Sequence, residues 1–330
     1  MRSIGIGILG AGRISDLHAI EYLRGVGARI VAVCDRDREL AAGKAAAWGV
    51  QPSRVFAKLE ELLACDEVDL VEILLPHDLH LPATLAALAA GKAVSVQKPM
   101  ATSLADGMAM VAAAERGGQF FKVFENFVFY PPVQKAKALL EEGVIGEPLT
   151  IRIKSTFGDP RHGWEIPGSA RAWRLDPARC GGGPIVFDDG HHKFALAWWL
   201  MGMPEEVHAW IGRTEVAGGM VDGPAMISFR FPGSRLGVFE AVHARDLLVE
   251  TRHYAQDDQI EITGSRGVLW VTQGHGRLGD RPPVILYRDG ETTGFSAMPT
   301  GWEESFVGST RDTIEALRDG RPPVLTGAQG

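Results

Sequence analysis

The chain has few cysteines and no pairing pattern among them. Cys34, Cys65 and Cys180 lie far apart, and their spacing does not match a zinc site. An odd, sparse set of this kind fits free thiols in a reducing compartment better than a disulfide framework. We therefore expect a cytoplasmic protein without disulfides.

Long apolar runs and basic stretches are also lacking. No apolar run approaches the roughly 18 residues that a membrane span needs. The net charge is −7, from 34 basic and 41 acidic residues, and the basic residues form no cluster. This composition argues against binding to nucleic acid. A strand is predicted almost at the first residue, so we expect no targeting leader.

A glycine turn near the N-terminus is the most informative motif that is present. The apolar run 4–9 predicts a buried strand, and Ile14, Leu17, Ile20 and Leu23 follow at helical spacing. Gly10 and Gly12 lie in the turn between them, where backbone N–H groups and the positive helix end face one spot. This arrangement predicts a cradle for a pyrophosphate. A plain structural turn is the alternative.

Asp35 ends the next predicted strand, residues 29–34. An acidic side chain at this place can accept hydrogen bonds from a ribose diol, which favours NAD over NADP. Arg36 follows directly and weakens that preference, because it can turn toward a 2′-phosphate. We therefore predict NAD, with NADP as the alternative.

The order of predicted elements divides the 330-residue chain into two domains. In residues 1–124, short apolar runs alternate with helical patterns, which is typical of the parallel sheet of an α/β Rossmann domain. Residues 125–330 predict a few helices and many short strands with turn signals. We expect an α+β domain there, with a large, mostly antiparallel sheet open on one face.

Four further segments match a known family. They are Pro76-His77-Asp78-Leu79-His80, Gln97-Lys98-Pro99, residues 143–148, and Asp188-Asp189-Gly190-His191-His192 after three glycines. In this order they resemble the Gfo/Idh/MocA family, named for glucose–fructose oxidoreductase and inositol dehydrogenase. The resemblance covers nearly the whole chain. It implies a nicotinamide-dependent dehydrogenase that acts on CH–OH groups of a sugar, cyclitol or related polyol.

The chain departs from the family pattern at two of these places. Ser15 occupies the third small position of the glycine turn, and Gln97 stands where family members have glutamate before the lysine and proline. By resemblance, the Lys98–Pro99 peptide is cis, and the loop with Pro76 and His80 passes under the nicotinamide. A role for His80 at a helix end is the alternative. The predicted cofactor-binding residues are Gly10, Gly12, Arg13, Ile14, Asp35, Arg36, Pro76, His80, Gln97 and Lys98.

Three residues are predicted to carry the chemistry. Lys98 follows the fifth predicted strand at the carboxyl edge of the sheet, where its ammonium can stabilise charge on a reacting oxygen. Asp188 and His192 are four residues apart on one face of a predicted helix. By resemblance, His192 is the acid/base and Asp188 supports it or binds substrate. The alternatives are a surface lysine, and a helix-capping aspartate beside an incidental histidine.

The remaining candidates are less specific. His191 and Asp189 sit beside this motif, but no third ligand is evident and family members do not generally need a metal, so we predict none. Asn126 lies in the crossover between the predicted domains. Arg171, Trp173 and Arg174 precede the triple glycine, where the arginines can bind substrate oxygens. Surface salt bridges are an equal alternative for them.

Two other functions remain open at this point. One is an NAD-dependent glycoside hydrolase of the same superfamily, which releases sugar without net NADH. The other is a non-catalytic protein that senses nucleotides. The open sheet face and the resemblance also imply a homodimer or homotetramer.

Overall fold

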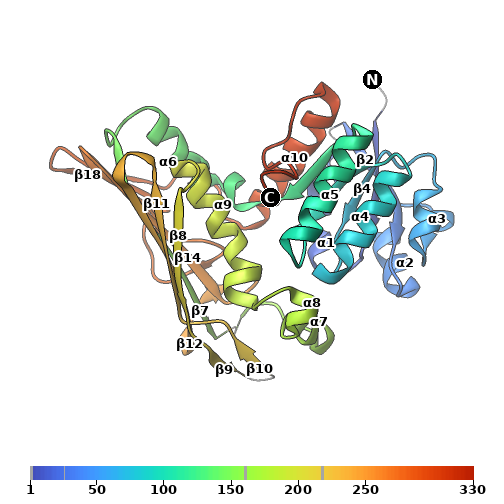
Figure 1. Cartoon of the computed structure of the whole chain (residues 1–330), viewed down its shortest axis with the longest axis horizontal. Helices are drawn as coiled ribbons and strands as arrows, with labels where there is room; N and C mark the ends of the chain where they lie inside the picture. Colours follow the sequence, from blue (N-terminus) through green and yellow to red (C-terminus); the bar gives the residue numbers. More distant parts are fainter. Residues whose placement is uncertain (1–2, 26, 160–161, 217–218) are drawn as a thin grey trace. The chain divides into compact units, whose positions relative to one another are not determined.

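The computed structural model describes residues 3–25, 27–159, 162–216 and 219–330, and the chain forms two compact units. The first unit comprises Met1–Asn126, Ala178–Gly181 and Phe306–Gly330. The second comprises Phe127–Pro177 and Gly182–Ser305. The chain therefore leaves the first unit and returns to it at the C-terminal end (Figure 1).

The first unit is built on a six-stranded parallel sheet in the order β3-β2-β1-β4-β5-β6. The apolar runs become strands because both faces of the sheet are covered, and Ile6, Ile8 and Val96 are fully buried. The strands are β1 Ile4–Leu9, β2 Ala28–Cys34, β3 Val55–Phe56, β4 Leu70–Ile73, β5 Ala93–Gln97 and β6 Phe121–Phe124.

Five helices connect these strands: α1 Ile14–Leu23, α2 Arg38–Ala47, α3 Leu59–Leu63, α4 His80–Ala89 and α5 Leu104–Gly117. Their ends follow local chemistry. The Asp37 carboxylate caps α2 by accepting from the N–H groups of Glu39 and Leu40, and Ser103 caps α5. This strand order, with a helix between successive parallel strands, is that of a dinucleotide-binding domain, as the sequence predicts.

A helix that the sequence analysis did not single out completes the first unit. This helix is α10, Glu303–Asp319, and Ile314 packs into the apolar core around β1 and β2. The buried ammonium of Lys122 on β6 lies 2.9 Å from the Asp312 carboxylate and 3.0 Å from the Ser309 carbonyl oxygen. Because the Lys122 ammonium is fully buried, its charge needs the Asp312 carboxylate as a partner, and this contact holds α10 against the sheet.

The second unit is built on an eight-stranded sheet in the order β18-β17-β15-β14-β7-β12-β11-β8. All neighbouring strands are antiparallel except β7 and β12. The strands are β7 Pro148–Asp159, β8 Glu206–Ile211, β11 Ala225–Phe231, β12 Arg235–Leu248, β14 Gln256–Gly264, β15 Gly267–Val271, β17 Val284–Arg288 and β18 Glu291–Phe295. Two-stranded pairs are β9 Thr214–Val216 with β10 Gly219–Val221, and β13 Glu250–Thr251 with β16 Gly276–Arg277.

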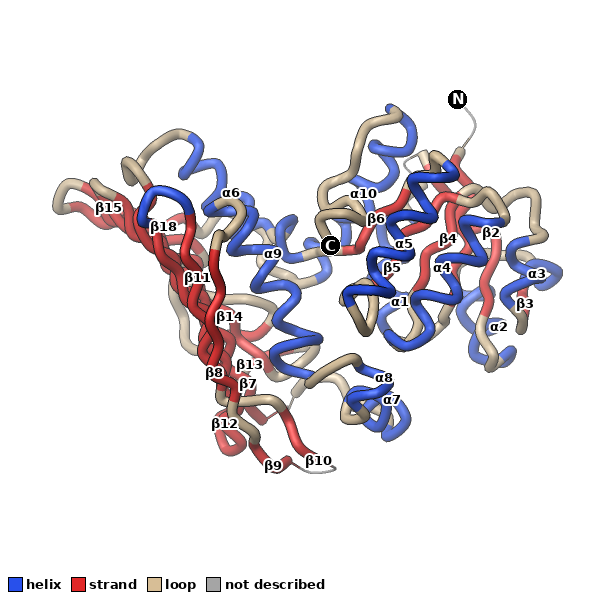
Figure 2. Tube along the Cα trace, in the orientation of Figure 1, coloured by secondary structure: helices blue, strands red, loops and turns tan. Residues whose placement is uncertain are grey.

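Helices α6, Pro131–Glu141, and α9, Gly190–Met201, run along one face of this sheet (Figure 2). The strands alternate accordingly, because successive side chains point to opposite faces. Ile227, Phe229 and Phe239 are buried toward the helices, whereas Met226 and Leu236 are about half exposed on the other face. The expectation of a mostly antiparallel sheet with one open face is confirmed.

Two short helices precede α9, namely α7 Gly168–Arg174 and α8 Pro177–Cys180, and a π-helix spans Pro184–Asp189. Among the described helices, none combines the length and apolar character required to cross a membrane.

Candidate active site

The glycine turn joins β1 to α1 in a way that requires glycine at one position and leaves room at the other. Gly10 has φ +102°, and a Cβ there would lie 2.4 Å from the carbonyl oxygen of Leu74. A Cβ on Gly12, by contrast, would meet no protein atom within 4 Å. The space above Gly12 therefore lies outside the protein's own packing, beside the first turn of α1.

This space fits a dinucleotide phosphate. The start of a helix carries its positive end, although in α1 the N–H groups of Ser15 and Asp16 already donate to the carbonyl oxygens of Gly12 and Arg13. Arg13 precedes Ile14 at the start of α1 and gives no side-chain cap, so it does not close the end of the helix. Ser15 is fully buried and donates to the Gly12 carbonyl oxygen at 2.6 Å. Its small size serves packing within the turn.

Asp35 lies directly beside this turn. One carboxylate oxygen accepts the Ala11 N–H at 2.8 Å, and the other accepts the Asp37 N–H at 2.9 Å. These two bonds hold the carboxylate at the end of β2, and each oxygen keeps a further lone pair for a ligand. Arg36 follows and is exposed.

Lys98 and Gln97 stand at the carboxyl end of β5 and are both partly exposed. The Lys98–Pro99 peptide is cis, as expected. The Lys98 N–H donates to the Oε1 atom of Gln97 at 2.8 Å. The side chain of Gln97 therefore helps to fix the backbone position of Lys98 at the end of the sheet.

His80 is fully buried at the start of α4, after the loop that holds Pro76. Its Nδ1 lies 2.9 Å from the Pro99 carbonyl oxygen, and its Nε2 lies 2.9 Å from that of Leu75. The imidazole thus joins the loop after β4 to the loop after Lys98. Burial and the neighbouring His77 lower the pKa of His80 to about 4, although the two carbonyl oxygens favour its protonated form.

A buried polar cluster next to β5, the strand that leads to Lys98, was not predicted from the sequence. Glu72, in the middle of β4, accepts hydrogen bonds from His18 and Tyr22 on α1 and from Ser95 on β5. Two sequence features could have indicated this cluster, namely one carboxylate inside an apolar strand and a histidine on the inner face of a helix.

In the second unit, Asp188 and His192 are both buried but belong to different elements. Asp188 lies in the π-helix, and His192 lies in the first turn of α9. The expectation that one regular helix carries both is therefore wrong, because the helix widens before Gly190. The His192 ring packs against that of Phe127, with 4.5 Å between centroids and an angle of 40° between the ring planes.

Asp222 holds the start of the π-helix. Its carboxylate accepts from the N–H groups of Ile185 and Val186, at 2.8 and 2.7 Å. A Cβ on Gly183 would clash with this carboxylate, at 1.9 Å from its Cγ. The last glycine of the triple-glycine segment is therefore required by close packing against Asp222, which sequence reasoning did not identify.

Arg174 forms an ion pair with Asp188, with 3.4 Å between its Nε and the carboxylate. Its guanidinium lies 4.4 Å from the centre of the Trp173 ring. Arg171, one turn earlier on α7, is exposed. The structure thus brings Trp173, Arg174 and Asp188 together, while Asn126 is buried in the first unit just after β6.

A buried lysine fixes the beginning of α9. The Lys193 ammonium lies 3.3 Å from Asp189 and 3.0 Å from Asp258 on β14. Burial lowers the pKa of Lys193, but the two carboxylates raise it by more, so the pair of contacts keeps its charge. Within the described ranges, no group of three or more His, Cys, Asp or Glu side chains is arranged to hold a metal ion.

Comparison with known proteins gives matches over most of the chain. Residues 4–125 match the family model described as the oxidoreductase family with an NAD-binding Rossmann fold, and residues 133–270 match the GFO/IDH/MocA C-terminal domain. The D-apiose dehydrogenase of Paraburkholderia graminis is 30% identical over 97% of this chain and 82% of its own length. The myo-inositol 2-dehydrogenase of Thermotoga maritima is 26% identical over 98% and 91% of the two chains.

Solved structures share the fold. An oxidoreductase from Agrobacterium radiobacter, in complex with NAD+, L-tartaric acid and magnesium, aligns with a TM-score of 0.85 at 23% identity, over 99% of this chain and 92% of the other. A levoglucosan dehydrogenase in complex with NADH and levoglucosan aligns with a TM-score of 0.81 at 21% identity, over 99% and 93%.

The low pKa of His80 predicts a pH-dependent stability. The ordinary histidine pKa of 6.5 applies to the unfolded chain, and the folded value is about 4. Between these values the unfolded chain binds the extra proton, so the free energy of unfolding should fall as the pH drops, by about 3 kcal/mol in all. Urea unfolding at pH 4–7.5 would measure this.

His80→Gln should remove this part of the slope, and His208→Gln on the exposed strand β8 is the control for loss of an exposed imidazole. An unchanged slope in His80→Gln would contradict the prediction.

Proposed function

Because the chain belongs to the Gfo/Idh/MocA family of NAD-binding oxidoreductases, we propose that it transfers a hydride between NAD and a hydroxyl-bearing carbon of a sugar, cyclitol or related polyol. The observation that carries this proposal is the open space at Gly12, framed by the start of α1 and the Asp35 carboxylate. The matched relatives are named as dehydrogenases of D-apiose, myo-inositol and levoglucosan. These names favour a dehydrogenase over a glycoside hydrolase or a nucleotide sensor.

Hydride exchange at carbon is the chemistry that NAD supplies when bound. For the chain, we assign the phosphate contacts to the turn from Gly10 to Ile14 and the ribose contact to Asp35. Gln97, Pro76 and His80 shape the edge near Lys98, with His80 acting by joining two loops. The first unit thus carries the proposed cofactor contacts, and the second carries most of the proposed substrate contacts and the proposed subunit contacts.

Loss of a hydride from carbon turns the hydroxyl into a carbonyl and releases its proton. We assign that proton to the His192 imidazole and stabilisation of the reacting oxygen to the Lys98 ammonium. Asp188, which is paired with Arg174, supports the site or binds substrate. The proposed substrate contacts are Asn126, Arg171, Trp173 and Arg174. All three cysteines are buried, and no disulfide joins them, which supports the prediction of a cytoplasmic location.

Catalytic variants test these roles. Acid–base catalysis typically contributes about 10²–10⁴-fold, so turnover should collapse by that range in His192→Ala and comparably in Lys98→Ala. NADH affinity should survive in His192→Ala. Asp188→Asn should cost less if Asp188 only supports the site, and as much if it also holds substrate. The assay is a screen of sugars, cyclitols and sugar acids with NAD, read by NADH absorbance.

His191→Ala is the matched control, one residue earlier on α9, and should keep turnover within about twofold of the original. Near-normal turnover in His192→Ala would show that another group moves the proton. Sugar release without net NADH would favour the glycoside hydrolase instead.

Cofactor choice is tested at Asp35. Its carboxylate should repel a 2′-phosphate and bind the ribose diol, so NAD should bind more tightly than NADP. A hydrogen bond to a charged group is worth about 1.5–3 kcal/mol, so Asp35→Ser should weaken NAD binding by about tenfold or more. Calorimetric affinities for both cofactors would measure this. Tighter binding of NADP by the unaltered protein would contradict the assignment.

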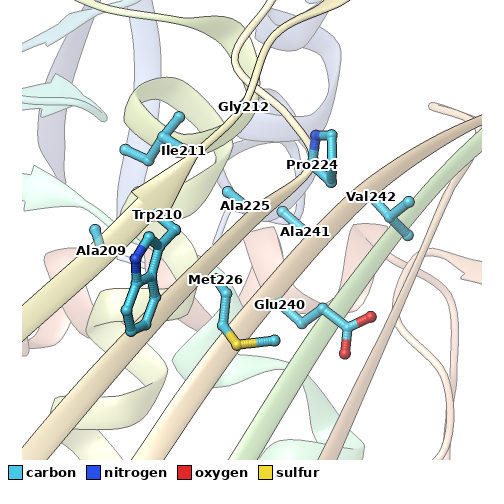
Figure 3. A pocket seen from close by; sticks show the side chains of 10 residues that line it. All are labelled: Ala209, Trp210, Ile211, Gly212, Pro224, Ala225, Met226, Glu240, Ala241 and Val242. Atoms are coloured by element: carbon cyan, nitrogen blue, oxygen red, sulfur yellow. The ribbon is translucent and has the colours of Figure 1, made fainter.

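We also propose that a second copy of the chain covers the open sheet face. On three adjacent strands, Trp210, Met226 and Glu240 stand side by side in register and line a shallow hollow (Figure 3). Trp210 is 61% exposed and Met226 46% exposed. Exposed apolar groups gathered in this way mark an interaction surface, and the other residues of the hollow are small or apolar.

Light scattering after size exclusion should therefore give at least twice the monomer mass at micromolar concentration. The double variant Trp210→Lys and Met226→Lys should lower the mass toward the monomer, because burying two ammonium groups is unfavourable. Leu104→Lys, an equally drastic change at an exposed residue of α5, is the control. A monomeric unaltered protein would contradict the proposal.

A further inference from the structure

A carboxylate lies fully buried in the central parallel sheet, next to the strand that leads to Lys98. Glu72 on β4 is paired with Ser95 on β5 in the sheet register. Its Oε1 accepts from His18 Nδ1 at 2.8 Å and from the Ser95 hydroxyl at 3.2 Å. Its Oε2 accepts from the Tyr22 hydroxyl at 2.5 Å. Burial and the nearby Glu72 raise the pKa of Tyr22 well above its ordinary value, so this hydroxyl stays a donor.

The position of the His18 ring is determined by its neighbours. It is fully buried, with the Phe124 ring centroid at 4.0 Å and that of Phe306 at 5.2 Å. Its second nitrogen, Nε2, lies 2.9 Å from the amide nitrogen of Gln97. An amide N–H can only donate, so Nε2 must accept, and the remaining ring proton is on Nδ1, facing Glu72. The arrangement therefore specifies a neutral His18 and one tautomer.

The orientation of the Gln97 amide follows independently from the backbone. The Lys98 N–H needs an acceptor and finds Gln97 Oε1 at 2.8 Å. The opposite amide orientation would place two donors against each other there. Four groups thus form one chain of donors that runs in a single direction, from the Lys98 peptide through Gln97 and His18 to Glu72.

We infer that Glu72 and His18 are positioning residues for Lys98, acting through the Gln97 amide on the Lys98 peptide. This inference rests on the role proposed above for Lys98. Neither Glu72 nor His18 is exposed to solvent, so neither can touch a cofactor or substrate. Their influence on turnover must pass through the backbone from which the lysine side chain starts.

The inference explains why glutamine suits position 97 in this chain. The side chain there must accept from the Lys98 N–H and donate to a neutral imidazole at the same time, and glutamine does both. Glutamate would still accept the peptide N–H, but its second oxygen would face the Nε2 lone pair. Relief would require an additional proton on His18, between two carboxylates.

Gln97→Glu is therefore the decisive variant. At high pH the repulsion should displace Lys98, and a misplacement of about 1 Å costs about 10²-fold in turnover. At low pH, His18 should take up a proton and the contact should be restored. The ratio of the variant's kcat to that of the unaltered protein should consequently rise as the pH falls. The contact geometry assigns this proton to His18, and the ionisable groups around it in the variant are Glu72, Tyr22, the carboxylate introduced at position 97 and, through Glu72, Lys122.

Nitrogen NMR of the histidine side chains gives a readout that does not depend on turnover. The unaltered protein should show His18 as a neutral Nδ1–H tautomer, and Gln97→Glu should show an imidazolium that titrates with the kcat ratio. Adding His18→Gln to Gln97→Glu should weaken the pH dependence, because it removes the imidazole that takes up the proton and leaves only the introduced carboxylate to titrate.

Tyr22→Phe is the matched control. It removes a donor from the same buried carboxylate but lies outside the chain to Lys98. It should lower the free energy of unfolding while leaving kcat within about twofold. This comparison separates a general loss of stability from displacement of Lys98.

The outcomes distinguish the inference from the proposed function. A flat kcat ratio in Gln97→Glu, together with collapse of turnover in Lys98→Ala, would overturn the inference and leave the function standing. Full turnover in Lys98→Ala would overturn the role of Lys98, even where NMR shows the expected tautomer. An imidazolium at His18 in the unaltered protein would overturn the inferred chain of donors itself.

Discussion

A buried carboxylate needs hydrogen-bond donors. In this chain the donors to Glu72 organise the edge of the first sheet. The donors come from α1 and β5. Helix α1 is also the helix whose first turn frames the space at Gly12, and β5 is the strand that ends at Gln97, directly before Lys98. Burying Glu72 without hydrogen-bond donors would be unfavourable, so its donors on α1 and β5 must stay in place. The proposed phosphate cradle and the proposed catalytic lysine are therefore coupled, because both depend on this helix and this sheet.

In the second unit, the buried charge that needs partners is positive. The buried cation of Lys193 is compensated by Asp189 at the end of the π-helix and by Asp258 on β14. Gln256 adds a hydrogen bond to Asp189 at 2.9 Å. The start of α9 is thus tied to the sheet at the turn that carries His192. In each unit, a compensated buried charge lies within a few residues of the groups assigned to the chemistry.

Much of the first unit could be predicted because its signals are local. Apolar runs of strand length, the glycine turn and Asp35 follow from adjacent residues, and all lie as expected. Helix α10 was not predicted to join this unit, because its contact with Lys122 links residues 190 positions apart. Glu72 and His18 gave no periodic signal, since a single polar residue within an apolar strand or on the inner face of a helix does not change the pattern that predicts either element.

The π-helix shows where helical spacing fails as a guide to chemistry. Residues four apart share a face only in a regular α-helix, and a π-turn inserts a residue and rotates what precedes it. Here the widened turn gives two adjacent carboxylates different partners, with Asp188 beside Arg174 and Asp189 beside Lys193. Asp222 caps the start of this segment by accepting from the N–H groups of Ile185 and Val186, which lie in its first turn and have no partner within it. Asp189 therefore anchors α9 through Lys193, while Asp188, its neighbour beside Arg174, is the carboxylate that we propose to support the site.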